Sequence, residues 1–217
     1  MLKKEIITEC QRCGTCCMKG GPALHEDDLR HVDSGAIPLT SLYTIRKGEL
    51  AYDNVNANGG LVCMPSEIVK IKSRTDSKTC MYFDDANKSC GIYDTRPIEC
   101  RAMECWNTTG IENIYYKNRL DRNAVLKNIS WLLELVTAHE SKCSLDRIQA
   151  MVNAREAGDH NAASELSEML NYDSHLRNLV VEKGGLSMEM ADFLFGRSLA
   201  DIIPRQFGVK VSKGKDP

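Results

Sequence analysis

Ten cysteines constrain this chain more than any other feature of its sequence. Eight of them form two groups, Cys10, Cys13, Cys16 and Cys17, then Cys80, Cys90, Cys100 and Cys105. Disulfides at this density are typical of secreted domains, whereas residues 1–8 are charged and lack the apolar run of a secretory signal. We therefore predict a cytoplasmic protein whose reduced thiols bind metal, with disulfide pairing as the less favoured alternative.

Charge and hydropathy argue against two classes of partner. Residues 1–105 carry 14 basic and 15 acidic side chains, and so do residues 106–217, so no basic face predicts nucleic-acid binding. No apolar run approaches the roughly 20 residues that a membrane helix needs. We expect neither nucleic acid nor membrane as a partner, and a redox or other protein partner that the sequence does not identify.

The first cysteine group places a thiol at every third residue, as Cys10-x2-Cys13-x2-Cys16. Bacterial ferredoxins wrap a [4Fe–4S] cluster with a similar run, C-x2-C-x2-C-x3-C-P. Here the fourth cysteine follows at once as Cys17, and the side chains of adjacent residues rarely point at the same atom. We expect Cys16 and Cys17 to serve different metals, or one of them not to be a ligand.

The second group is spaced too widely for one loop, since nine, nine and four residues separate its cysteines. A hairpin over residues 80–93 and a turn at Arg96-Pro97 would be needed to bring these thiols together. Neither group has the two separated C-x2-C pairs of a zinc ribbon. Eight thiols make two four-thiolate sites, which could hold two [4Fe–4S] clusters, two zinc ions or one of each. We predict one or two [4Fe–4S] clusters, with Zn²⁺ as the alternative.

Cations lie close to these cysteines in the sequence. Two [4Fe–4S] clusters with four thiolates each would carry about four negative charges, which must be compensated when buried. The basic residues within four positions of a grouped cysteine include Arg12, Lys19, Arg96 and Arg101. They could compensate the clusters and tune their potential, or simply be surface cations.

These motifs resemble a known family. The matching segments are Cys10-Gln-Arg-Cys13-Gly14-Thr-Cys16-Cys17 and Cys90-Gly-Ile-Tyr93-Asp-Thr-Arg96-Pro97-Ile-Glu-Cys100-Arg101, with Cys80 before and Cys105 after the second. Together, over about residues 8–106, they look like the YkgJ-type cysteine-cluster family, also called CxxCxxCC. The resemblance implies chelation of iron or zinc by the eight cysteines, with Tyr93, Arg96 and Arg101 packed around the site. A longer branch of this family includes flagellin lysine N-methylases, which use S-adenosylmethionine.

The hydrophobic pattern predicts an α+β protein, with an irregular cysteine-rich domain over residues 1–110 and a helical bundle-like region over 111–217. The first part should contain a helix at 24–32, strands at 42–45, 49–53 and 67–72, and the hairpin at 80–93. Apolar stripes predict helices from residue 112 onward, with Ser144 as an N-cap, a break at Gly158-Asp159, a stop at Gly184-Gly185 and a last helix ending near Pro204. The tail from residue 210 should be frayed.

The cysteines and histidines outside the two groups are predicted to have structural roles rather than to bind metal. Cys63 and Cys143 are expected in the core, although His139 and Cys143, four residues apart on one helix, could also share a metal. His25 and His31 do not form an H-E-x-x-H motif, and exposed helix positions are expected for both.

Three hypotheses for function follow. The first is an iron–sulfur protein for electron transfer or sensing. The second is an enzyme in which a cluster held by only three cysteines binds a small molecule, such as S-adenosylmethionine, to modify a protein side chain; no glycine-rich turn of a Rossmann methyltransferase is present. The third is a zinc-stabilised interaction module, whose metal contributes folding energy.

Overall fold

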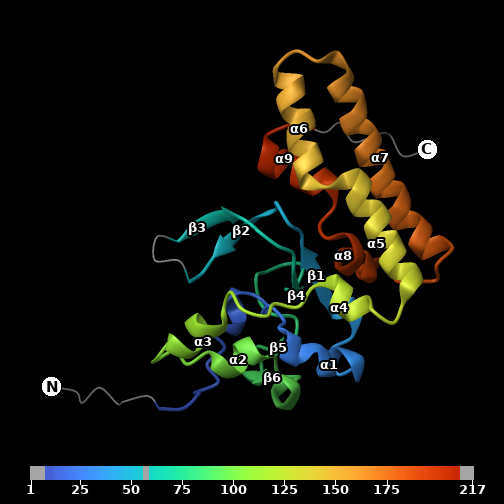
Figure 1. Cartoon of the computed structure of the whole chain (residues 1–217). Helices are drawn as coiled ribbons and strands as arrows, with labels where there is room; N and C mark the ends of the chain where they lie inside the picture. The colour runs from blue at the N-terminus through green and yellow to red at the C-terminus, as the bar shows by residue number, and fades with distance from the viewer. Residues whose placement is uncertain (1–7, 56–58, 211–217) are drawn as a thin grey trace. The chain divides into compact units, whose positions relative to one another are not determined.

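The computed structural model describes residues 8–55 and 59–210. Two predictions, the missing secretory signal and the frayed tail, concern residues 1–7 and 211–217, which lie outside the described residues. The chain folds into two compact units, each built from two segments (Figure 1). Unit 1 comprises Met1–Leu42 and Val69–Val125, and unit 2 comprises Tyr43–Ile68 and Leu126–Pro217. The sequence-based boundary at residue 110 stays a prediction.

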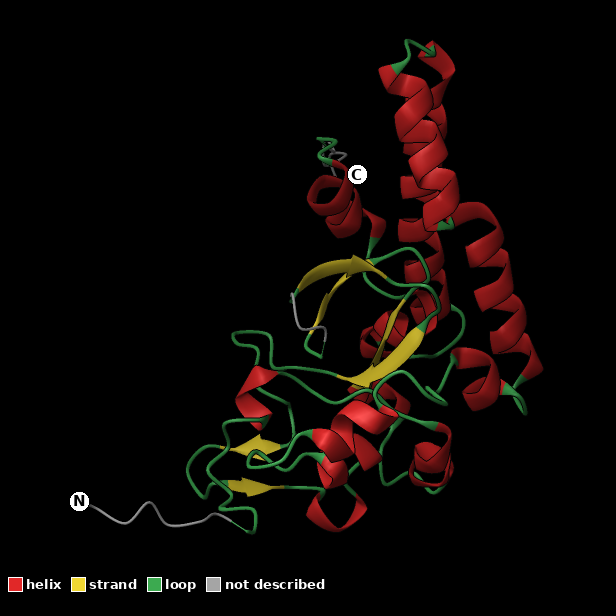
Figure 2. Ribbon diagram, turned by 60° about the vertical axis from the view of Figure 1, so that its left-hand side comes forward, coloured by secondary structure: helices red, strands yellow, loops and turns green. Residues whose placement is uncertain are grey.

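Unit 1 holds both cysteine groups and consists largely of loops with short elements (Figure 2). Its helical segments are η1 (Cys17–Lys19), η2 (Glu26–Asp28), α1 (Leu29–Asp33), η3 (Leu39–Ser41), η4 (Tyr93–Thr95), α2 (Ile98–Ala102) and α3 (Thr109–Ile114). Strand β4 (Ile68–Ile71) and α4 (Arg122–Leu126) each cross a unit boundary. The helix predicted over 24–32 is thus a 3-10 turn followed by a single α-helical turn.

The predicted hairpin over 80–93 is confirmed. Strands β5 (Phe83–Asp84) and β6 (Ser89–Cys90) pair antiparallel, with Phe83 opposite Cys90. Asp84 closes the turn because its carboxylate accepts hydrogen bonds from the N–H groups of Ala86 (2.9 Å) and Asn87 (3.2 Å). The guanidinium of Arg74 donates to the Phe83 carbonyl oxygen and to Asp85. This turn presents Cys90 at the end of a strand and returns the chain toward α2.

Unit 2 is mainly helical. Its helices are α5 (Ser130–Cys143), α6 (Leu145–Glu156), α7 (His160–Glu182), α8 (Met188–Phe195) and α9 (Leu199–Phe207). Ser144 caps α6 as predicted, since its side chain accepts from the Arg147 N–H, and Asp159 caps α7 in the same way. Strands β2 (Leu50–Asp53) and β3 (Gly60–Cys63) form an antiparallel pair, and β1 (Leu42–Ile45) leads into this unit.

The last predicted helix is wrong in its extent. It is divided into α8 and α9 at Gly196, which has a φ of 69°. A Cβ atom there would lie 3.0 Å from the Thr44 carbonyl oxygen and 2.9 Å from Arg46 Cγ, so only glycine fits. Pro204 lies inside α9 and does not end it.

The core of unit 2 confirms one prediction for a single cysteine. Cys143 is fully buried with Leu145, Ile148, Leu166 and other apolar side chains of α6, α7 and α9. Burial raises the pKa of its thiol to about 12, so it behaves as a small hydrophobic residue. The matching prediction for Cys63 is wrong: this residue is exposed, and its thiol donates to the Gly48 carbonyl oxygen at 3.2 Å. Cys63 lies on a two-stranded ribbon, which has too few neighbours to cover it.

The environment of His25 differs from its prediction. His25 is buried, with 3% of its surface exposed, because polar partners from distant parts of unit 1 surround its ring. The expectation of an exposed His25 is therefore wrong. No described helix has the length and apolar character needed to cross a membrane.

Candidate metal centre

A backbone hydrogen bond brings the two cysteine groups together. The N–H of Cys80 donates to the carbonyl oxygen of Cys17 at 2.8 Å, although 63 positions separate them. Two glycines make this approach possible. At Gly14, where φ is 80°, a Cβ atom would lie 2.1 Å from the ring of Phe83, and at Gly21 it would lie 2.1 Å from the Ile71 carbonyl oxygen. The first cysteine loop therefore packs directly on β4 and β5.

The adjacent thiols of Cys16 and Cys17 interact with each other. A hydrogen bond from the Cys17 thiol lowers the pKa of Cys16 to about 6. The same bond raises the pKa of Cys17, because the donor must keep its proton, and burial adds to this rise. One member of the pair is thus an accessible thiolate near neutral pH, and the other is its hydrogen-bond donor.

Three thiols of the second group join this pair. Burial raises the pKa of the Cys80 thiol, and thiolate charge at Cys90 and Cys16 adds to the rise. Although Cys100 as a whole is exposed, desolvation of its thiol likewise raises the pKa, with further contributions from Cys80, Cys90 and Cys16. Mutual charge effects of this kind act over short distances, so all five thiols lie in one small region.

Of the other three grouped cysteines, Cys13 adjoins this set, because the charge of Cys16 acts on its thiol. Cys10, Cys13 and Cys105 are exposed. A hydrogen bond with the Thr15 hydroxyl, 3.2 Å from the sulfur, lowers the pKa of Cys13. Among the described residues, no three His, Cys, Asp or Glu side chains are spaced closely enough to hold a metal ion as they stand. Ligation by all eight cysteines stays a prediction.

The donor chemistry of this region fits a thiophilic centre. Its candidate ligands are all thiols, the donors that zinc and iron–sulfur clusters share. A bound cation deprotonates a coordinating thiol outright, which would reverse the effect of burial on Cys80 and Cys100. The residues that would hold such a centre are therefore Cys16, Cys17, Cys80, Cys90 and Cys100, extended by Cys10, Cys13 and Cys105.

The cations predicted near the thiols have different partners. The guanidinium groups of Arg12 and Arg96 both stack on the ring of Tyr93, at 4.5 and 3.9 Å from its centroid. Arg96 also donates to the Tyr93 carbonyl oxygen at 2.7 Å. Arg101 instead lies 3.9 Å from the buried carboxylate of Asp28. The structure thus places Tyr93 and Arg96 together with Arg12, and turns Arg101 toward a carboxylate.

Sequence reasoning missed two cations of this region, Lys70 and Arg74, and the charge of Arg74 lowers the pKa of Cys80. Lys70 lies on β4, and burial lowers the pKa of its ammonium group, while the negative charges of Glu99, Cys100 and Cys80 raise it. Its place in an alternating strand pattern gave no sign of this neighbourhood. Only the packing of β4 against the cysteine loops brings Lys70 to the thiols.

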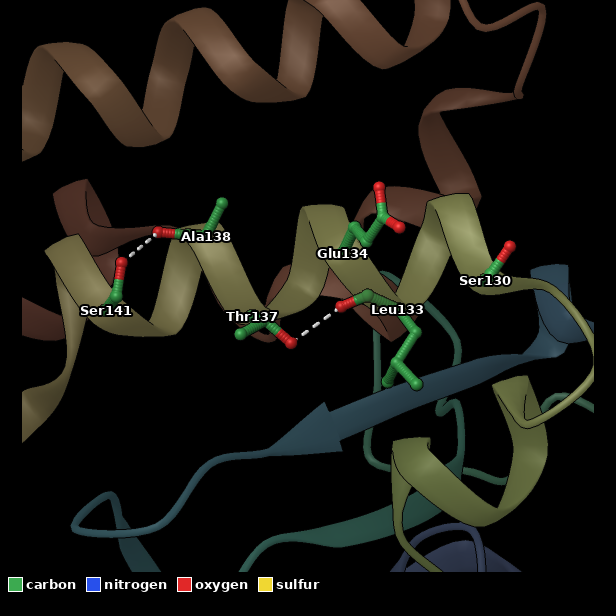
Figure 3. Close-up of a pocket in the computed structure, with 6 residues that line it drawn as sticks. All are labelled: Ser130, Leu133, Glu134, Thr137, Ala138 and Ser141. Carbon is green, nitrogen blue, oxygen red and sulfur yellow. Dashed lines mark hydrogen bonds between the residues drawn. The ribbon is translucent and has the colours of Figure 1, made fainter.

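A groove in unit 2 has a different character. It runs along one helix, α5, and is lined by Ser130, Leu133, Glu134, Thr137, Ala138 and Ser141 (Figure 3). The hydroxyls of Thr137 and Ser141 donate to carbonyl oxygens of their own helix, at 2.8 and 2.9 Å. No thiol or imidazole lines this groove, so it offers no soft metal ligand.

A thiol-rich loop folded onto a cysteine-bearing hairpin and helix defines a class of metal-chelating domain. The chain matches the family model CxxCxxCC, "Putative zinc- or iron-chelating domain", over residues 9–127, which is more than half of its length. The protein therefore belongs to this family, as the sequence motifs indicated. Comparison with curated proteins and with solved structures finds no significant match.

Proposed function

We propose that this protein binds one or two [4Fe–4S] clusters in unit 1 and serves electron transfer or redox sensing in the cytoplasm. One observation carries the proposal. The hydrogen bond from Cys80 to Cys17 joins the two sequence groups, so that five thiols share one region. Thiolates that lie close together repel one another, which is unfavourable, and the binding of a metal centre would offset this repulsion.

We infer the ligand sets from the thiols that this contact brings together. Cys80, Cys90 and Cys100 with one of the adjacent pair Cys16 and Cys17 would hold the first cluster. The other member of the pair would join Cys10, Cys13 and Cys105 in a second. The first thiols of the chain repeat every third residue, as in ferredoxin loops, and this spacing favours iron–sulfur over zinc.

The cations near Tyr93 support a negatively charged centre. For Arg12 and Arg96, no ion pair with a carboxylate is recorded among the described residues, and both guanidiniums stack on one ring. Two like charges on one ring repel each other, and a nearby anion would offset that repulsion. A metal centre with four thiolates supplies that anion, whether the metal is iron–sulfur or zinc.

Metal analysis of anaerobically purified full-length protein tests the proposal. We expect a brown protein with about four iron and four acid-labile sulfide per cluster, and an EPR signal after reduction. A colourless protein with stoichiometric zinc would overturn it in favour of a zinc-stabilised interaction module. Protein that retains neither metal after anaerobic reconstitution would overturn both.

Variants then separate redox from catalytic roles. Cys80→Ser should lose the first cluster, whereas Cys63→Ser, at an exposed thiol in unit 2, should keep the full metal content. If Cys105→Ser leaves both clusters intact, the second is held by three thiols and has an open iron. Perturbation of its EPR signal by S-adenosylmethionine would then favour the enzyme hypothesis over electron transfer.

A further inference from the structure

Buried carboxylates fix the short helix that carries Cys100. Helix α2 has five residues, and Cys100 stands in it between Glu99 and Arg101. Isolated helices of this length are not stable, because one turn forms too few hydrogen bonds to offset the ordering of the chain. The orientation of Cys100 must therefore come from contacts outside the helix.

Asp28 supplies the first of these contacts. Its side chain is completely buried at the end of η2. One carboxylate oxygen accepts from the Ile98 N–H at 2.9 Å, and the other accepts from the His25 N–H at 3.0 Å. Ile98 is the first residue of α2, so its N–H has no partner within the helix. Because Pro97 at the N-cap gives no side-chain hydrogen bond, Asp28 does the work of a cap from 70 positions away.

Glu99 supplies the second contact. One of its carboxylate oxygens accepts from the Ala23 N–H at 2.7 Å, and the other lies 3.4 Å from His25 Nε2. The opposite ring nitrogen of His25 donates to the Lys117 carbonyl oxygen at 2.7 Å. The segment over residues 23–28 thus holds α2 on both sides of Cys100, and this segment begins only six positions after Cys17.

Burying these groups is costly, which argues that the arrangement is specific. Burial raises the pKa of the Asp28 carboxyl, and the N–H bonds from His25 and Ile98 work against that rise. A buried carboxylate persists only where several donors satisfy it. An apolar contact would hold α2 in place, but it would not fix the rotation that decides where Cys100 points.

We propose that Asp28 is a positioning residue of the metal centre, which sets the direction of Cys100 by capping α2. The inference rests on the proposed function, since it assigns Cys100 as a ligand. Asp28 touches no metal itself and acts only through α2. Outer residues that orient a ligand typically change metal affinity 10- to 100-fold when replaced, at about the scale expected here.

The test compares Asp28→Asn with Asp27→Asn, an exposed neighbour on the same 3-10 turn. Asparagine keeps the shape but can accept only one of the two N–H bonds. With metal-loaded full-length protein, we expect Asp28→Asn to release metal to a chelator about tenfold faster, and Asp27→Asn to match the original protein. In a Cys100→Ser background, Asp28→Asn should add no further acceleration, because the residue through which it acts is gone.

A second measurement needs no metal. In reduced, metal-free protein, mass spectrometry follows alkylation of each cysteine by iodoacetamide. We expect Asp28→Asn to change the rate at Cys100 severalfold, with the rates at exposed Cys63 and buried Cys143 unchanged, which rules out general unfolding.

The outcomes separate the two ideas. Equal acceleration of metal release with and without Cys100, or an unchanged alkylation rate at Cys100, overturns the positioning role of Asp28 while the proposed function stands. Original protein that holds no metal refutes the proposed function, and the alkylation rates then still decide whether Asp28 positions Cys100.

Discussion

Replacing Asp173 by asparagine should destabilise unit 2 strongly. Asp173 lies on α7 and is almost completely buried. One of its oxygens lies 2.8 Å from His139 Nε2, and Arg177 Nε donates to both oxygens at 3.1 Å. The Leu199 N–H at the start of α9 donates to the second oxygen at 3.0 Å. This single carboxylate therefore ties α5, α7 and α9 together.

The pKa of Asp173 indicates the order of magnitude of its contribution. Burial alone would raise this pKa, but the hydrogen bond from His139 and the charge of Arg177 prevail and lower it from 3.8 to about 2. Such a shift corresponds to roughly 2 kcal/mol. Removing one partner of a buried ion pair costs about 3–5 kcal/mol. Arg177 would lose its nearest carboxylate and keep the half-exposed Asp192 at 4.0 Å. We expect a loss of about 2–5 kcal/mol for Asp173→Asn.

Urea unfolding near neutral pH, followed by far-ultraviolet circular dichroism, measures this loss. With a slope of about 2 kcal/mol per molar urea, the midpoint should fall by roughly 1–2.5 M. Glu168→Gln, at an exposed carboxylate of the same helix, should shift the free energy of unfolding by less than about 0.5 kcal/mol. A midpoint for Asp173→Asn as close to the original as that of Glu168→Gln would refute the reasoning.

Three further predictions concern pH, metal and the cysteine loop. Acid should destabilise unit 2 in two steps, because burial lowers the pKa of His139 below 6.5 and its partners lower that of Asp173 below 3.8. As pH falls, the unfolded chain therefore binds more protons than the folded chain, first at His139 and then at Asp173, and each step lowers the free energy of unfolding. A urea midpoint that stays constant from about pH 7 to about pH 5 would contradict the step assigned to His139. Removing metal from loaded protein with a chelator should lower its melting temperature. Cys17→Ser should have a lower metal content and a lower melting temperature from the start, whereas Cys63→Ser should match the original protein. Equal metal contents and melting temperatures in all three proteins would exclude Cys17 as a ligand. Gly14→Ala should lower the free energy of unfolding by more than about 1 kcal/mol and reduce the metal content, because φ is 80° there and the added methyl group would meet the ring of Phe83. An unchanged melting temperature in calorimetry would contradict this expectation and show that the loop moves aside.

Local patterns were sufficient for much of the secondary structure. The turn residues between Cys80 and Cys90 predicted the β5–β6 hairpin, and Ser144 and Asp159 mark the starts of α6 and α7. These signals act between residues a few positions apart, so they can be read directly from the chain. The division between α8 and α9 could not be read in this way, because the need for glycine at 196 comes from Thr44 and Arg46.

The sequence by itself determined the family, the eight grouped thiols and the hairpin that turns the second group back. The sequence did not show which thiols would lie in the same region. Five of them are brought together by the contact of Cys17 with Cys80 and by the packing of α2. The sequence also predicted His25 as exposed, whereas Glu99 and the Lys117 carbonyl group lie against the two nitrogens of its buried ring. Local sequence predicts that charged and polar side chains are exposed, because burying them without partners is unfavourable. Partners from distant positions offset that desolvation, and only the tertiary structure supplies them.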